Sequence, residues 1–218
     1  DVRSVLRVGD LRQFQAFLQA GAGRVGQLLN LASLGADVGI SHNTAREWLS
    51  VLEATFVAFR LRPFFRNVSK RLMKSPKLYF YDTGLVCSLL GVRSPEDLAT
   101  HPLRGQVVEN WVVVEVMKER LHRGLNPDLC FFRDHKGVEV DLLVETGTKL
   151  IAVEIKAGQT FVPAWTSSFD RLHDIEIAAG REPQIEERVI YGGPESFRFK
   201  NAQVSPWNHI DRLAWEPS

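Results

Sequence analysis

The feature that most constrains this chain is an acid-bearing stretch over residues 131–156, with the sequence FFRDHKGVEVDLLVETGTKLIAVEIK. Short apolar runs alternate there with polar residues, which is typical of strands. The turn-forming pairs Lys136-Gly137 and Thr146-Gly147 divide the stretch into two or three short strands. The pattern therefore predicts a small antiparallel sheet that carries carboxylates where it could have remained apolar.

Strand alternation sorts these side chains between two faces, because residues i and i+2 lie on the same side. Glu139 and Asp141 are predicted on one face of their strand, and Glu154 and Lys156 share a face of the next strand. Adjacent strands would bring Asp141, Glu154 and Lys156 to one spot. Two carboxylates and a lysine there form a candidate site for a hard cation and a water molecule. The opposite, apolar faces would carry Val138, Val140, Leu142 and Val144 and, on the next strand, Ile151, Val153 and Ile155.

Length and composition indicate a globular chain. With 218 residues, 44% of them hydrophobic, it can bury a sizeable core in one large domain or two small ones. Cys87 and Cys130 lie among apolar neighbours without metal-ligand spacing, which predicts reduced thiols in a cytoplasmic protein. No apolar run is long enough for a membrane span, and no signal peptide is predicted. The chain begins at Asp1, so we expect an excerpt of a longer protein.

Charge divides the chain in two. Residues 1–104 hold 14 Lys and Arg against 8 Asp and Glu, a net charge of +6, whereas the remainder has a net charge of −5. This split predicts two modules with different partners.

The N-terminal module is predicted to be helical. Apolar spacing favours a helix over Val8–Gly21 behind an Asp10 cap, and a second helix beginning over Arg24–Asn30. Residues 31–36 and 41–54 follow in the order helix, turn, helix, with Ser41 as the second cap. This is the arrangement of a helix-turn-helix, whose recognition helix presents its first turn to DNA. The predicted DNA-contacting side chains are His42, Asn43, Thr44 and Arg46.

Two strands, Phe56–Leu61 and Lys77–Tyr81, are predicted to flank a basic loop that resembles the wing of a winged helix. Such a loop beside a helix-turn-helix favours phosphate contact. Protein contact or a simple connection between domains remains an open alternative. The basic residues of this region, which contains no acid, are Arg60, Arg62, Arg66, Lys70, Arg71, Lys74 and Lys77.

The second module is predicted as an α/β core. A long helix over Gly105–Leu121 carries Glu109 in an apolar neighbourhood, and a buried carboxylate requires a partner or a cation. Strands follow, with a helix over Pro163–Gly180 crossing over to a parallel strand at Glu187–Tyr191. Before this module, Asp82 is predicted to cap a helix over residues 85–90. Residues 94–99 are predicted to form a short helical turn. The first strand is predicted over residues 129–134 and the last over 197–199, ahead of a short helix packed by Trp207 and Trp215.

Glu109 on a helix, Asp141 on a strand and Glu154-Ile155-Lys156 on the next resemble the PD-(D/E)xK nuclease-like fold. The combination of YFYDTGL at 79–85, GQVVEN at 105–110, FFRDHKGVEVD and IAVEIK is similar to the C-terminal region of a prokaryotic family of predicted AAA+ ATPases. In that family a P-loop ATPase domain precedes a winged helix and the nuclease-like domain. This chain contains no GxxxxGK[ST] motif, so ATP binding would belong to the ATPase domain of the parent protein.

The resemblance implies a winged-helix domain over residues 1–90, a linker over 91–104 and a restriction-endonuclease-like α/β (α+β) domain over 105–218. It implies that Asp141, Glu154 and the Ile155 carbonyl bind Mg²⁺ and that Lys156 orients or activates the attacking water. Glu109 would support a second ion or a metal-bound water. Arg133 and Gln159 are further candidates for phosphate contact, and Glu139 is a candidate for supporting the ligands.

Two function classes remain open. In the first, the chain is a Mg²⁺-dependent nuclease acting on DNA, targeted by the winged helix and driven by the parent ATPase. In the second, it is a non-catalytic DNA- or protein-binding region in which the acids form salt bridges. The expected partners are DNA, the N-terminal ATPase domain and a second copy of the chain, without a membrane.

Overall fold

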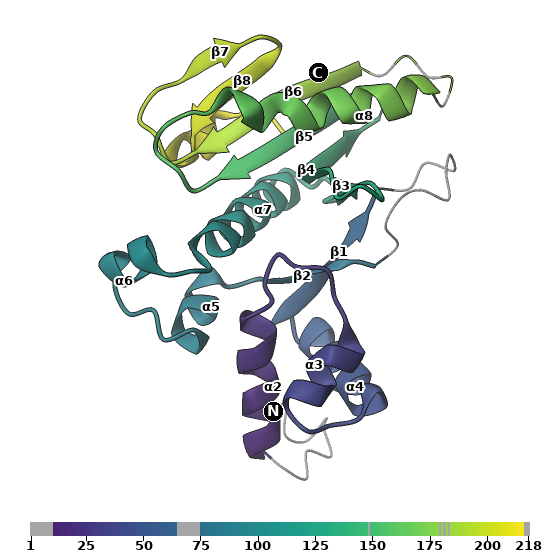
Figure 1. The fold of residues 1–218 in the computed structure, drawn as a ribbon, viewed down its shortest axis with the longest axis vertical. Coiled ribbons are helices and arrows are strands. Elements are labelled where there is room, and N and C mark those ends of the chain that lie inside the picture. Colours follow the sequence, from purple (N-terminus) through teal and green to yellow (C-terminus); the bar gives the residue numbers. More distant parts are fainter. Residues whose placement is uncertain are drawn as a thin grey trace. The chain divides into compact units, whose positions relative to one another are not determined.

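The computed structural model describes residues 11–64, 75–147, 149–178, 180, 182 and 184–215. The architecture is mixed α/β, with eight strands among these residues (Figure 1). The chain divides into two compact units. The first unit comprises Asp1–Leu61 and Ser75–Trp111, and the second comprises Arg62–Lys74 and Val112–Ser218.

Among the described residues, the first unit begins with the helices α2 (Leu11–Ala22), α3 (Leu31–Asp37) and α4 (His42–Ala54). The helix-turn-helix order is as predicted, and the Ser41 side chain accepts a hydrogen bond from the Thr44 N–H, which caps α4. Asp10, the predicted cap of α2, lies outside the described residues. The core of the unit includes an aromatic group in which Trp48 lies edge-on to Phe14 and Phe17. The four predicted core positions of α4, Ala45, Trp48, Leu49 and Leu52, are buried.

The prediction of a helix over Arg24–Asn30 is wrong. This segment forms turns and one isolated bridge, Leu28 to Lys77. Gly26 has a φ of 71°, and its N–H donates to the Leu78 carbonyl at 2.8 Å. The left-handed backbone, which glycine tolerates, turns the chain out of a helix and against a strand.

The strand pair and helices predicted next are present. β1 (Ala58–Pro63) pairs antiparallel with β2 (Lys77–Phe80). Asp82 caps α5 (Thr83–Leu89) by accepting from two backbone N–H groups, and α6 (Pro95–Thr100) begins with a capping box.

Helix α7 (Arg104–His122) follows, and the division between the two units falls within it. In the first unit its Asn110 side chain is buried and bonds to both the N–H and the carbonyl of Phe80, at 2.8 and 3.1 Å. This side chain ties the first half of α7 to β2 and thereby fixes the position of Glu109 beside that strand.

The second unit contains a mixed sheet in the order β3-β4-β5-β6-β8-β7. The meander β3–β4–β5 is antiparallel, β6 and β8 continue it in parallel, and β7 closes it antiparallel to β8. At the end of β1, Arg62 and Pro63 also belong to this unit and pair parallel with β3. The strands are β3 (Leu129–Arg133), β4 (Glu139–Thr146), β5 (Lys149–Lys156), β6 (Gln184–Tyr191), β7 (Phe197–Phe199) and β8 (Ala202–Pro206).

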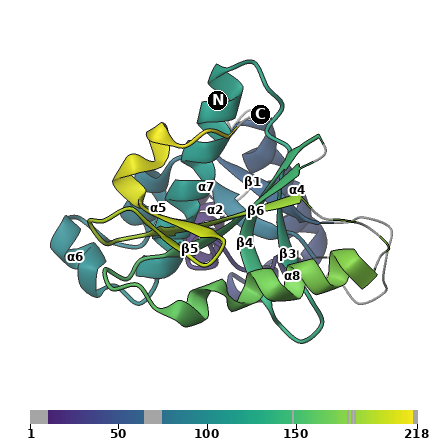
Figure 2. The same ribbon diagram turned by 90° about the horizontal axis from the view of Figure 1, so that it is seen from above.

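The predicted crossover between β5 and β6 is present, but it begins with a 3₁₀ turn, η1 (Pro163–Thr166), before α8 (Ser167–Ala178). Figures 1 and 2 show α8 along one side of β4, β5 and β6. Phe169 and Leu172 of α8 pack into the same core cluster as Ala152 and Val189 of the sheet. Both faces of β5 are buried, so its acids lie at the edge of a closed core rather than on an open polar face.

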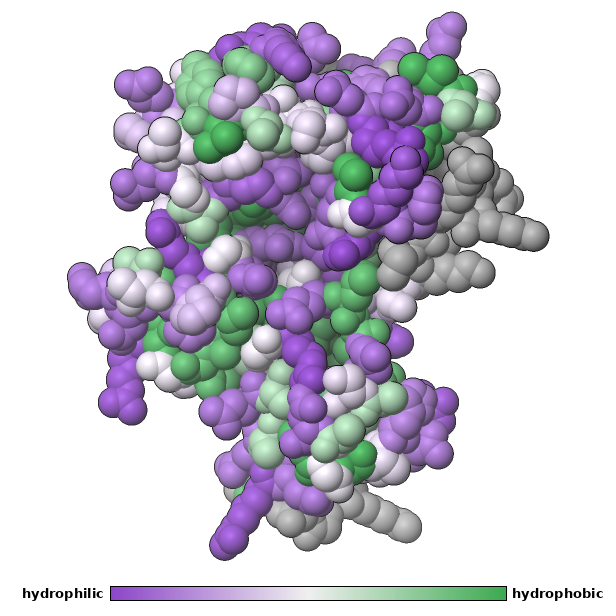
Figure 3. Space-filling view, viewed as in Figure 1, coloured by the Kyte–Doolittle hydropathy of each residue, from purple (hydrophilic) through white to green (hydrophobic). Residues whose placement is uncertain are grey.

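The prediction that residues 197–199 form the last strand is wrong, because β8 follows and inserts between β6 and β7. After β8 comes η2 (Trp207–Arg212), and Trp215 is fully buried with its Nε1 donating to the Ile210 carbonyl. On the face shown in Figure 3, hydrophobic residues gather over β7 of the second unit. No helix within the described ranges has the length and apolar character needed to cross a membrane.

Candidate functional site

The structure places Asp141, Glu154 and Lys156 together in the second unit, as the strand pattern predicted. Lys156 Nζ lies 2.5 Å from Glu154 Oε1 and 3.6 Å from Asp141 Oδ2. Asp141 Oδ2 also accepts the backbone N–H of Ile155 at 2.8 Å. One carboxylate from each strand therefore faces one ammonium group, and the Asp141 side chain is held by the backbone of the neighbouring strand.

A β-bulge gives Asp141 this position. Cys130 pairs with Leu143 and Phe132 pairs with Val140, so β4 uses three steps where β3 uses two. The extra residue lies around Asp141, where β-bulges redirect side chains. Strict alternation along β4 was therefore a wrong prediction: Val140 and Leu143 lie in the same core cluster.

Glu154 is the most strongly perturbed acid of the group. Its exposed fraction is 7%, and burial together with the nearby charge of Asp141 raises the pKa of its carboxyl to about 8. Lys156 and a hydrogen bond from Ser168 oppose this shift without cancelling it. The site therefore favours the uncharged form of Glu154 unless further positive charge arrives.

Ser168 was not predicted from the sequence. It lies in the first turn of α8, is buried, and its Oγ donates to Glu154 Oε2 at 3.0 Å. Glu154 is thus held on one oxygen by Lys156 and on the other by Ser168. A serine one residue into a helix gives no distinctive sequence signal, so only the fold reveals this contact.

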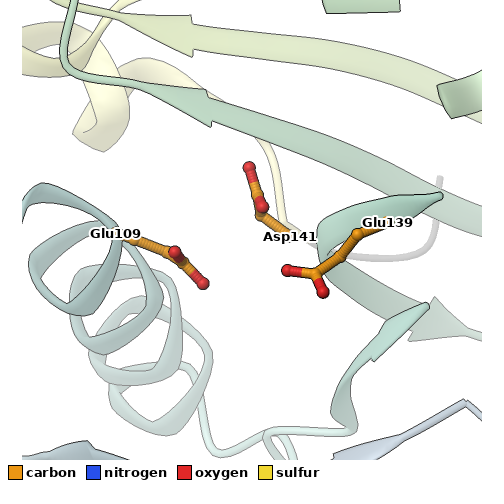
Figure 4. Close-up of side chains that lie close together, drawn as sticks. All are labelled: Glu109, Glu139 and Asp141. Atoms are coloured by element: carbon orange, nitrogen blue, oxygen red, sulfur yellow. The ribbon is translucent and has the colours of Figure 1, made fainter. Parts of the chain in front are cut away.

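Glu139 lies two residues before Asp141 on β4, and Figure 4 shows both side chains projecting from that strand. Their carboxylate oxygens lie within 4.8 Å of each other, and Arg133 Nη1 lies 2.9 Å from Glu139 Oε2. Arg133, predicted as a phosphate contact, is therefore engaged by a carboxylate. Gln159, the other such candidate, is exposed in the segment after β5.

Glu109, also drawn in Figure 4, belongs to the first unit and has its own partners there. Its Oε1 accepts from Lys77 Nζ at 2.8 Å and from the Tyr79 hydroxyl at 2.5 Å. Lys77 is only 2% exposed. The predicted requirement that this carboxylate have a partner is met within the first unit by a buried lysine.

This pairing corrects the predicted basic loop. Lys77 was assigned to it but is buried, while Arg60 pairs with Glu53 and Arg62 with Glu145. Its other cations, Arg66, Lys70, Arg71 and Lys74, lie outside the described residues. The described part of this region therefore offers less uncompensated positive charge than its sequence suggested.

The predicted recognition residues lie at the start of α4. His42, Asn43 and Arg46 are exposed, and Arg46 Nη2 donates to Asn43 Oδ1 at 3.1 Å. Thr44 is half-buried and its hydroxyl shares a hydrogen bond with Ser41. The turn presents polar and cationic groups to solvent, as contact with a nucleic acid would require.

Comparison with known proteins identifies two regions. Residues 1–96 match the family model described as Domain of unknown function (DUF8612), and residues 104–210 match Domain of unknown function (DUF4143). Two similar proteins are uncharacterized protein Mb2031c of Mycobacterium bovis and uncharacterized protein Rv2008c of Mycobacterium tuberculosis. Each is 31% identical over 182 residues, which is 83% of this chain and 38% of the relative.

The chain thus spans well under half the length of these relatives. The search of solved structures gave no significant match. The chain therefore combines regions that match two domain families of unknown function, and its candidate site lies on strands of the second region.

Proposed function

We propose that the second unit is a PD-(D/E)xK-type, Mg²⁺-dependent nuclease domain that hydrolyses phosphodiester bonds in DNA. The observation that carries the proposal is the cluster of buried Asp141 and Glu154 with half-buried Lys156 on adjacent strands. Its residue types, their order along the chain and their convergence suit phosphodiester hydrolysis better than a surface salt bridge, because Asp141 and Glu154 are both less than a tenth exposed.

The donor set fits a hard divalent cation. Counting Arg133, Glu139 and the three central groups, three carboxylates face two cationic side chains, so ionisation of Glu154 leaves a net negative charge. A divalent ion would supply the missing positive charge and favour the ionised form of Glu154. Asp141 and Glu154 would hold Mg²⁺, with the main-chain carbonyl of Ile155 as a further ligand.

Each residue then has a distinct role in hydrolysis. Lys156, held by Glu154, would position the attacking water and offset negative charge in the transition state. The hydrogen bond from the Ile155 N–H would keep the Asp141 carboxylate oriented toward the site. A bound Mg²⁺ would supply Lewis-acid polarisation of a phosphoryl oxygen.

We further propose that the first unit is a winged helix that contacts DNA, and that the parent protein carries an N-terminal AAA+ ATPase domain in the cytoplasm. The exposed polar turn of α4 next to the α3 turn supports DNA contact. The relatives' greater length is consistent with a further domain in a longer parent.

A second candidate function is a non-catalytic binding region with a degenerate nuclease fold. It is favoured by one observation: Lys156 already pairs with both Asp141 and Glu154, so the cluster has internal partners without an ion. In that case the cluster would hold β4 to β5, and DNA or a protein would bind elsewhere on the chain.

The test is cleavage of supercoiled plasmid and of single-stranded DNA by the full chain with Mg²⁺. Asp141→Ala and Glu154→Ala are expected to lower the rate by about 100-fold or more, because each removes a ligand. Asp211→Ala, at an exposed acid of the same unit, is the matched control and should leave the rate unchanged. Cleavage that persists in both site variants would exclude this active site, and absence of cleavage by the native chain would favour the binding region.

A further inference from the structure

An aromatic cluster lies beside the candidate site in the second unit. It consists of Phe161, Trp165, Tyr191, Phe197 and Phe199, which come from the segment after β5, the end of β6 and β7. Their ring centroids lie 5.1–6.5 Å apart. The cluster packs against the core of this unit. Large apolar rings are unusual beside a polar site.

The sheet register sets the cluster next to the site lysine. Tyr191 is the pairing partner of Lys156 in the parallel ladder of β5 and β6. The segment that carries Phe161 and Trp165 begins directly after Lys156. The cluster is therefore one strand away from the ammonium group that would position the attacking water.

The cluster is partly open to solvent. Phe197 is 37% exposed, and neighbouring Val162 is 43% exposed. Phe161 and Trp165 are half-buried. Figure 3 shows hydrophobic residues gathered over β7 on this side of the unit. Rings that only filled the core would be buried as completely as Phe169, which has no exposed surface.

The surrounding backbone holds the rings in place. The Tyr191 hydroxyl donates to the Glu195 carbonyl at 2.9 Å, which fixes the turn that leads into β7. Gly193 packs so closely on the Tyr191 ring that a Cβ would clash. Because these contacts already hold the Tyr191 ring in place, a ligand that stacks on the cluster loses little free energy to the ordering of side chains.

The charge around the cluster suits a polyanion. Residues 157–166 contain no charged side chain, and residues 191–200 contain Arg198 and Lys200 against Glu195. Lys200 Nζ lies 5.9 Å from the centre of the Phe199 ring. Aromatic faces beside cationic side chains are how proteins bind unstacked nucleobases along a phosphate backbone.

We propose that the cluster is a stacking platform for unpaired bases, so that the substrate of the candidate site is single-stranded DNA or a single-stranded end. The choice of nucleic acid over a protein ligand rests on the proposed nuclease function. Bases in an intact duplex are stacked on each other and cannot reach the rings, whereas a single strand offers its base faces at no unpairing cost.

The experiment measures binding of the full chain to fluorescein-labelled oligo-dT and to a duplex of the same length, in EDTA so that nothing is cleaved. Native protein should bind oligo-dT more tightly than duplex. Phe197→Ala should weaken oligo-dT binding by about tenfold, because base stacking contributes this much per base. Val162→Ala, an equally exposed apolar neighbour without a ring, is the matched control and should bind as the native chain does.

Two further measurements separate stacking from a folding defect. Phe197→Trp keeps a stacking face and should restore native affinity, while circular dichroism checks the fold of each variant. An oligonucleotide containing 2-aminopurine should lose fluorescence on binding the native chain and lose less with Phe197→Ala. Four outcomes would each overturn the proposal. They are equal affinity of Phe197→Ala and native protein, equal losses in Phe197→Ala and Val162→Ala, a preference for duplex, and no binding to oligo-dT.

These outcomes are distinct from failure of the nuclease proposal. A chain that binds oligo-dT through Phe197 but never cleaves DNA contradicts the nuclease function alone. A chain that cleaves DNA but binds oligo-dT equally well with Phe197→Ala contradicts the stacking platform alone.

Discussion

Two lysine–glutamate pairs, one in each unit, differ in their surroundings: Lys77 of the first pair is buried, whereas Lys156 of the second is half-buried. In the first unit, Lys77 Nζ lies 2.8 Å from Glu109 Oε1, with the Tyr79 hydroxyl on the same oxygen. In the second unit, Lys156 Nζ lies 2.5 Å from Glu154 Oε1 and also faces Asp141. In the first pair Lys77 faces Glu109, and we call this the matched pair; in the second Asp141 and Glu154 both face Lys156, and we call this the unmatched cluster.

The two pairs show how a structural ion pair differs from a candidate ligand site. A matched pair in a closed environment needs nothing more, and its loss leaves a buried charge. In an unmatched cluster one acid keeps a raised pKa, as Glu154 does. Such a cluster can be completed by a bound cation. The following predictions test whether the two pairs differ in this way.

The largest effect is expected from breaking the matched pair. Lys77→Met should lower the free energy of unfolding by about 3–5 kcal/mol, because it leaves Glu109 buried without its cation. Urea unfolding of the full chain measures this loss. Mg²⁺ should not restore the stability if the pair is purely structural.

The double variant Lys77→Met/Glu109→Leu is the informative partner, since removing both charges should recover most of the loss. Lys118→Ala breaks an exposed pair with Glu115 on α7 and should cost about 0.5 kcal/mol or less. A Lys77→Met variant as stable as Lys118→Ala would show that the first pair is not buried in solution.

An effect that is smaller at each pH step, and that has a distinctive pH signature, is expected at the unmatched cluster. The pKa of Glu154 is about 8 in the folded chain against an ordinary 4.5, so the folded state binds the extra proton between these values. The contribution of this residue to stability is therefore lost as the pH rises from about 4.5 to 8, by roughly 1 kcal/mol per pH unit.

Glu154→Gln lacks this proton, so its stability relative to the native chain should increase as the pH is raised from 5 to 8. Urea unfolding at a series of pH values measures the difference between the two proteins. Saturating Mg²⁺ should flatten the native slope, because a cation favours the ionised carboxylate. A constant difference across this pH range would mean that Glu154 is ionised throughout.

The smallest effect is expected at Ser168, which donates to Glu154 from α8. Ser168→Ala should cost about 1 kcal/mol of stability through the lost hydrogen bond. Ser168→Thr keeps the hydroxyl and should retain more of the stability, while Ser167→Ala changes an exposed neighbour and serves as the control. Calorimetric unfolding compares the three, and a loss as large in Ser167→Ala would remove any specific role of Ser168.

Local signals in the sequence predicted much of this fold. Ser41 and Asp82 were identified as helix caps because the capping chemistry lies within three residues of each helix start. The convergence of Asp141, Glu154 and Lys156 followed from two strands joined by a short turn. In these cases the residues that decide the structure are close together in the chain.

Features that depend on distant residues were missed. The bulge at Asp141 is visible only in the pairing of β3 with β4, and the burial of Lys77 depends on Glu109, which lies 32 residues away. The insertion of β8 between β6 and β7 reflects sheet topology, which a strand pattern alone does not specify. Strand pairing and ion pairs between residues far apart in the sequence are therefore visible only in the structure.

We expect a divalent cation to complete the cluster of Asp141, Glu154 and Lys156. Calorimetric titration of the full chain with Mg²⁺ measures this binding, with Asp141→Ala and Glu154→Ala as site variants and Asp211→Ala as the control. The native chain and the control should bind Mg²⁺, and both site variants should lose binding. Absence of Mg²⁺ binding to the native chain, or binding that both site variants retain, would contradict it.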